Sequence, residues 1–92
     1  MSRDLDIDEQ ELAKFIDVFS QFQDRIKDKF QSVESSWEKC NESWHGSSKD
    51  QFTKEFLETR RTIQESLDAG EDALTWLRRF DEVLKEFERQ YR

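Results

Sequence analysis

The absence of proline does the most to limit how this chain can fold. Among its 92 residues there is no proline, and the only glycines are Gly46, at the midpoint, and Gly70. Proline and glycine are the residues that most often end or interrupt a helix. The sequence therefore allows two long helices on either side of one central break, and the spacing of its apolar residues decides whether they form.

The first half carries apolar residues at steps of three and four, the spacing of one face of an α-helix. This stripe consists of Leu12, Phe15, Phe19, Phe22, Ile26, Phe30, Val33, Trp37, Cys40 and Trp44. Asp8 is a favourable N-cap, and Glu11 completes a capping box with it. The sequence predicts a helix over about residues 9–43, with Cys40 as a small buried hydrophobe in its stripe.

A second stripe occupies the other half, where Ser48 and Gln51 offer another capping box and predict a helix over about residues 49–91. Its members are Phe52, Phe56, Ile63, Leu67, Gly70, Leu74, Leu77, Leu84, Phe87 and Tyr91. From Ala69 onward a second apolar row follows at Ala73, Trp76, Phe80 and Val83. The apolar surface is then too wide for a single partner helix, so we expect something besides the first helix to cover it.

The segment Trp44-His45-Gly46-Ser47-Ser48 separates the two stripes. Gly46 can adopt a left-handed C-cap conformation without steric cost, and the two serines can cap the next helix. We therefore predict a turn at residues 44–48 and one all-α domain over residues 1–92, folded as an antiparallel two-helix hairpin.

Composition excludes several classes of function. Eight Phe, three Trp and one Tyr are too many aromatic residues for a disordered acidic chain. The net charge of −7 disfavours nucleic acid or an anionic membrane as a partner. No segment is apolar enough to span a membrane, and the N-terminal residues lack the apolar core of a signal peptide. We expect a cytoplasmic protein that, if exported, leaves without a signal peptide.

The residue types that carry chemistry are few and scattered. His45 and Cys40 are the only histidine and cysteine, and no nucleophile, base or metal-ligand pattern accompanies them. Residues 4–8 read D-x-D-x-D, but Glu9 and Phe15 stand where a calcium loop needs glycine and glutamate. We predict no catalytic, cofactor or metal site, and hence no enzyme.

The Trp44-His45-Gly46 motif, placed between two long amphipathic helices with Phe52 downstream, resembles the WXG family of ESAT-like proteins of bacterial type VII secretion. The resemblance implies a hairpin that dimerises into a four-helix bundle, either as a homodimer or with a similar hairpin. It also implies export through a membrane ATPase machine. Secreted members often carry Tyr-x-x-x-Asp/Glu after the second helix. Here the sequence has Tyr91-Arg92 and only Leu84-x-x-x-Glu88, so export alone and export with a partner both stay open.

The aromatic and apolar residues of the turn and the second helix are the candidate partner-binding residues. They are Trp44, Phe52, Phe56, Trp76, Phe80, Val83, Phe87 and Tyr91. Trp44 is either core or a half-exposed anchor for a partner. The favoured hypothesis is a non-enzymatic export substrate or co-secretion partner, and the alternative is a cytoplasmic adaptor or chaperone-like module that holds another helix.

Overall fold

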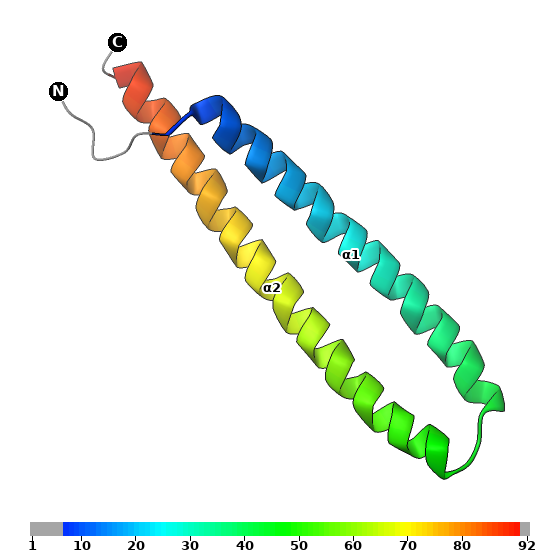
Figure 1. The fold of residues 1–92 in the computed structure, drawn as a ribbon. Coiled ribbons are helices and arrows are strands. Elements are labelled where there is room, and N and C mark those ends of the chain that lie inside the picture. The colour runs from blue at the N-terminus through cyan, green and yellow to red at the C-terminus, as the bar shows by residue number, and fades with distance from the viewer. Residues whose placement is uncertain (1–6, 91–92) are drawn as a thin grey trace.

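The computed structural model describes residues 7–90, which form two long helices, α1 (Glu9–Ser43) and α2 (Ser47–Gln90). The helices run antiparallel, so the start of α1 and the end of α2 lie at the same end of a narrow rod, with the turn at the other end (Figure 1). The rod measures 69 × 19 × 15 Å. The predicted all-α hairpin is confirmed, and the described residues contain no strand.

Local capping explains where α1 begins. The Asp8 side chain accepts hydrogen bonds from the backbone N–H groups of Gln10 and Glu11, at 2.9 and 3.2 Å. These bonds satisfy two of the donors that the first turn of a helix leaves without intrahelical partners. The sequence therefore fixes the start of α1 through one carboxylate.

The turn differs from its prediction in one respect. Gly46 has a φ of +112°, a conformation that favours glycine, but it does not cap α1. Trp44 is the C-cap, in extended conformation, and its N–H donates to the Cys40 carbonyl. Gly46 instead precedes α2, because its carbonyl accepts from the Asp50 N–H at 3.2 Å. Ser48 consequently lies inside the first turn of α2, two residues later than a cap would require.

The seam between the helices is rotated on α1 relative to the predicted stripe. Phe15, Phe22, Val33 and Cys40, all predicted in the stripe, are exposed, so the prediction that Cys40 is buried was wrong. Gln23 is only 4% exposed and lies in the seam, although the predicted stripe contained no polar residue. On α2 the buried residues follow the predicted stripe: Phe56, Leu67, Gly70, Leu74 and Leu84.

Gln23 is accommodated by a glycine and a carbonyl on the opposite helix. Its Nε2 donates to the Leu67 carbonyl oxygen at 2.9 Å, which satisfies a buried polar group. A Cβ placed on Gly70 would lie 2.4 Å from Gln23 Oε1. Gly70 is therefore needed for close approach of the helices and not for an unusual backbone conformation.

Polar contacts join the helices along one side of the seam. Ser20, Lys27 and Glu34 recur every seven residues on α1. Arg78 donates to Ser20 Oγ at 3.2 Å, Lys27 lies 3.7 Å from Glu71, and Arg60 lies 3.8 Å from Glu34. These ion pairs are exposed, so each contributes at most about 1 kcal/mol. This side of the hairpin is therefore its polar side.

Candidate functional site

Four aromatic rings form a cluster where the turn joins the two helices. Trp37 lies 5.2 Å from Phe52 and from Phe56, and Trp44 lies 5.6 Å from Phe52, measured between ring centroids. We call Trp37, Trp44, Phe52 and Phe56 the turn cluster. Aromatic pairs at these separations contribute about 0.5–1.5 kcal/mol beyond their buried area. The cluster therefore holds the end of the hairpin together with residues of this chain alone.

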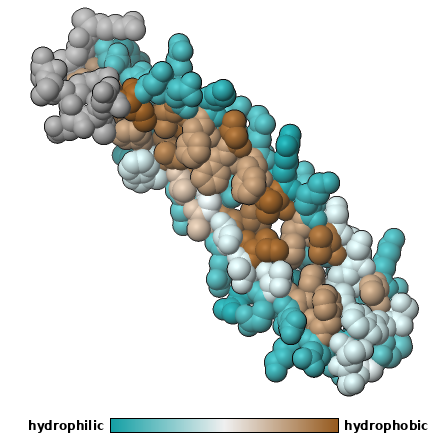
Figure 2. Space-filling model, viewed as in Figure 1, coloured by the Kyte–Doolittle hydropathy of each residue, from teal (hydrophilic) through white to brown (hydrophobic). Residues whose placement is uncertain are grey.

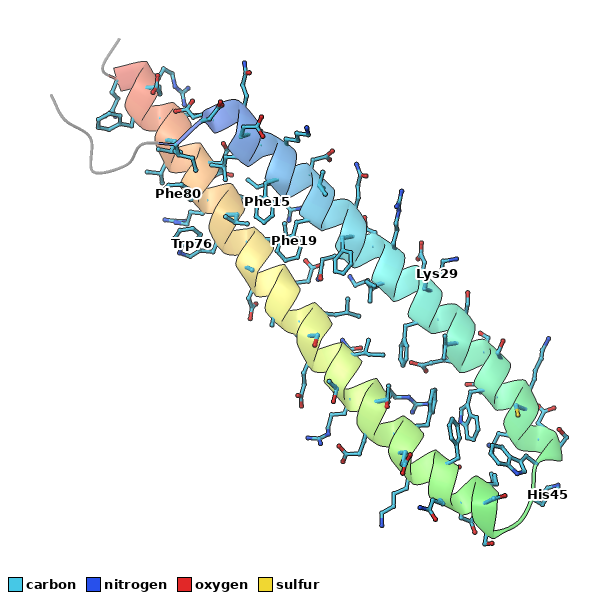
Figure 3. The ribbon with its side chains drawn as sticks, viewed as in Figure 1. Phe15, Phe19, Lys29, His45, Trp76 and Phe80 are labelled. Carbon is cyan, nitrogen blue, oxygen red and sulfur yellow. The ribbon has the colours of Figure 1, made fainter. Side chains whose placement is uncertain are left out.

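In the Trp-x-Gly motif, Trp44 contributes ring packing and Gly46 contributes an unusual backbone conformation. Trp44 is half-buried, with its ring edge-on to Trp37 at 6.3 Å, and one part of its surface stays open to solvent. His45 is exposed at the tip of the turn (Figure 3). A Cβ on Gly46 would meet no atom within 4 Å, so the requirement for glycine there comes from φ alone. The motif places a half-buried indole beside an exposed tip.

The predicted partner-binding residues do not form one surface. Phe56 is 8% exposed and lies within the turn cluster, so its ring is used by the hairpin itself. Trp76 is 63% exposed and Val83 57% exposed, at the other end of α2. Phe87 is half-buried, and Tyr91 lies outside the described residues, as do Asp4 and Asp6 of the D-x-D-x-D segment.

Near the end of α2, a row of large apolar side chains is exposed or partly exposed. The rings of Trp76 and Phe80 stack at 5.3 Å with an interplanar angle of 15°. Trp76, Phe80 and Val83 lie on the side of the seam away from the polar contacts, where the heptad spacing places them. Of the second apolar row predicted from the sequence, Trp76 and Val83 are exposed and Phe80 is half-buried.

The first helix contributes to the same surface through residues that sequence reasoning assigned to the core or overlooked. Phe15, Val18 and Phe22 are each more than half exposed, and they flank the seam on the side opposite Ser20 and Lys27. The helices are antiparallel, so this side of α1 adjoins the exposed row of α2. The i, i+3, i+7 spacing of the three residues was the available sequence pattern for a second row on α1.

Together these rows make a two-helix apolar surface, which we call the terminal face. It consists of Phe15, Val18 and Phe22 from α1 and Trp76, Phe80 and Val83 from α2. Figure 3 shows Phe15 and Phe19 at the same end of the rod as Trp76 and Phe80. Apolar side chains run along the viewed side of the rod between hydrophilic margins (Figure 2). Large exposed apolar patches often mark protein–protein contact sites, which makes the terminal face a candidate of that kind.

The described residues offer little for other kinds of chemistry. No group of three or more potential metal ligands occurs among residues 7–90. Within the same range, neither helix has an apolar stretch long enough to cross a membrane. The arrangement is suited to binding another protein through apolar surface.

Comparison with protein families agrees with the hairpin and its motif. The model of the WXG100 family, described as proteins of 100 residues with WXG, matches residues 4–90. Comparisons with curated proteins and with solved structures gave no significant match. The match covers nearly the whole chain, and the chain therefore belongs to the WXG100 family. Members of this family are helical hairpins exported by type VII secretion systems, and they commonly form dimers.

Proposed function

We propose that this chain is a non-enzymatic cargo of a type VII secretion system, exported as a folded hairpin paired with a second hairpin. The observation that carries the proposal is the terminal face, with Trp76 63% exposed in a chain that otherwise follows the family's hairpin pattern. Exposed apolar surface of this extent is unfavourable for a protein that stays alone. Pairing into a four-helix bundle would remove it from water.

The two ends of the hairpin have different roles in this proposal. The terminal face binds the partner hairpin, while Trp44, half-buried beside the exposed His45, is available to the secretion machinery. Anchors of protein contacts are often aromatic residues held rigid by their own neighbours. Trp44 meets that condition because its ring contacts both Trp37 and Phe52.

Export from the source bacterium tests the proposal. We expect the tagged protein in the culture medium of the wild-type strain and its retention in cells when the secretion ATPase is inactivated. Trp44→Phe, which keeps a ring in the turn cluster, should reduce export, whereas His45→Ala should leave it unchanged. Retention of the wild-type protein by cells that export their other type VII substrates would contradict the proposal and favour a role inside the cell.

A further inference from the structure

A groove opens between the helices on the polar side of the hairpin. It has a volume of about 590 Å³. On α2 it lies between Arg60 and Glu71, the residues that form ion pairs with Glu34 and Lys27 of α1. We call it the polar groove. The terminal face is on the opposite side of the seam, so a partner that covers that face would leave the polar groove accessible.

The polar groove combines an apolar base with a rim of hydrogen-bond acceptors. Its base contains Leu67, which is 6% exposed, and the half-buried ring of Phe30. The exposed residues of the rim all carry a side-chain oxygen that can accept a hydrogen bond, and they are Gln31, Ser35, Glu38 and Gln64. Gln64 Nε2 donates to Asp68 at 3.1 Å, so the amide oxygen of Gln64 is the atom left to accept.

The charges of the groove favour a cation from outside the chain. Lys27, the cation in the lining, lies 3.7 Å from Glu71 and is paired with it. Among residues 7–90, Glu38 forms no ion pair. A side chain that carries positive charge and several hydrogen-bond donors is therefore complementary to this rim.

Arg60 shows how this hairpin accommodates a guanidinium group. Its guanidinium carbon lies 5.6 Å from the centre of the Phe56 ring, and its Nη2 lies 3.8 Å from Glu34. An aromatic ring and a carboxylate thus hold the cation from two sides. The polar groove offers the same two groups, a ring from Phe30 and a carboxylate from Glu38.

We propose that an arginine side chain of a partner protein binds in the polar groove, with its guanidinium between the Phe30 ring and the Glu38 carboxylate. Leu67 follows Arg60 by seven residues in the same row of α2, so the chain itself places an aliphatic side chain there. Arginine fits better than lysine, because its planar group stacks on a ring and donates to several acceptors at once. The inference goes beyond the proposed function, since it assigns a second contact surface that does not depend on export.

An exposed leucine beside the groove indicates that the arginine belongs to a protein segment. Leu57 is 48% exposed and precedes Gln64 by seven residues, in the same row of α2. The two residues are about 10 Å apart at 1.5 Å per residue. An extended segment spans about 10 Å in three residues. A segment with an apolar residue three positions from its arginine would therefore contact both the groove and Leu57.

NMR titration with a synthetic peptide tests the proposal. The probe is acetyl-Leu-Ala-Ala-Arg-Ala-Ala-Leu-amide, which has a leucine three positions to either side of the arginine. We expect the largest shift changes at the side-chain amide signals of Gln31 and Gln64, which line the groove. Citrulline in place of arginine keeps the shape and removes the charge, and at low salt it should weaken binding about fivefold.

Matched variants locate the contact on the hairpin. Glu38→Gln should weaken binding of the arginine peptide about fivefold at low salt. Glu42→Gln removes a carboxylate one turn further along α1, outside the groove, and should have little effect. Leu57→Ala should weaken binding about threefold, whereas Val83→Ala, at an exposed residue of the terminal face, should leave it unchanged. Circular dichroism should show helical hairpins for all four variants, because each position is exposed.

The inference would be overturned by the absence of shift changes at Gln31 and Gln64 with the arginine peptide at about 10 mM. Equal binding of the citrulline peptide, or equal effects of Glu38→Gln and Glu42→Gln, would also contradict it. Shift changes centred on the Trp76 indole would place the peptide on the terminal face instead, against the proposal. None of these results concerns export, so the proposed function stands or falls separately.

Discussion

The two ends of the hairpin contain the same kinds of aromatic residue and use them in opposite ways. In the turn cluster, rings from both helices meet within one chain, and Phe56 is 8% exposed. In the terminal face, Trp76 stacks on the half-buried Phe80 and is itself 63% exposed. The rings of the turn end pack mainly within this chain, whereas the terminal end leaves Trp76 open, and we propose that a partner covers it. Aromatic content alone therefore does not distinguish a core from a binding surface.

The largest expected difference between the ends concerns the stability of the isolated hairpin. Phe56→Ala should lower the free energy of unfolding by about 3–5 kcal/mol, because it empties a buried position between Trp37 and Phe30. Trp76→Ala should change it by less than about 1 kcal/mol, since most of that side chain is already in water. Urea denaturation of dilute protein measures both values. Equal losses would remove the distinction between the two ends.

A smaller effect is expected at the backbone of the turn. Gly46→Val should cost about 1–2 kcal/mol, because a β-branched residue is disfavoured at the φ of +112°. Space is not limiting there, as a Cβ would have no neighbour within 4 Å, so Gly46→Ala should also destabilise the hairpin. Urea denaturation of both variants, with His45→Ala as the control, measures the effect. An unchanged midpoint for both would show that the turn readily adopts another backbone conformation.

The smallest net effect is expected at Gly70, where α2 approaches Gln23 of α1. Gly70→Ala should gain about 1 kcal/mol of helix propensity. It should also displace Gln23 from the Leu67 carbonyl, a loss of about 1–3 kcal/mol for a buried unsatisfied amide. The expected net result is a destabilisation of about 1 kcal/mol in urea denaturation.

The sign of that effect should depend on Gln23. In a Gln23→Ala background the obstructing amide is gone, and Gly70→Ala should become stabilising by up to about 1 kcal/mol. The double-mutant cycle would thereby isolate the steric and hydrogen-bonding contribution of one residue pair. The same sign in both backgrounds would contradict a role for Gly70 in accommodating Gln23.

Much of the fold could be predicted because its determinants are local. The apolar spacing predicts both helices, the Asp8 cap begins α1, and Gly46 lies at the break. The face of α1 that contacts α2 could not be predicted from local pattern. Apolar spacing assigns only apolar residues to the contact face, and so it leaves out Gln23. That residue is buried only because Gly70, 47 positions away, leaves room for it.

The candidate surface was predicted in part for a related reason. The row from Ala69 to Val83 could be predicted because it makes the apolar side of the second helix wider than one partner helix can cover. The matching row on α1 was missed, since Phe15 and Phe22 also fit a core stripe when the opposite helix is unknown. Phe56 was placed both in the core stripe and among the candidate partner-binding residues, and its ring packs in the turn cluster. The sequence pattern shows how the apolar residues are spaced along each helix, but the packing of the two helices determines which of them are buried.

The solvent exposure of Trp76 as a function of protein concentration tests the central claim most directly. In a Trp37→Phe, Trp44→Phe variant, Trp76 is the only indole, and its emission reports the terminal face alone. We predict red-shifted, readily quenched emission in dilute protein and a blue shift with protection from acrylamide as the dimer forms. Emission that stays red-shifted and fully quenchable over a concentration range in which sedimentation shows dimers would contradict the claim that this face is the contact.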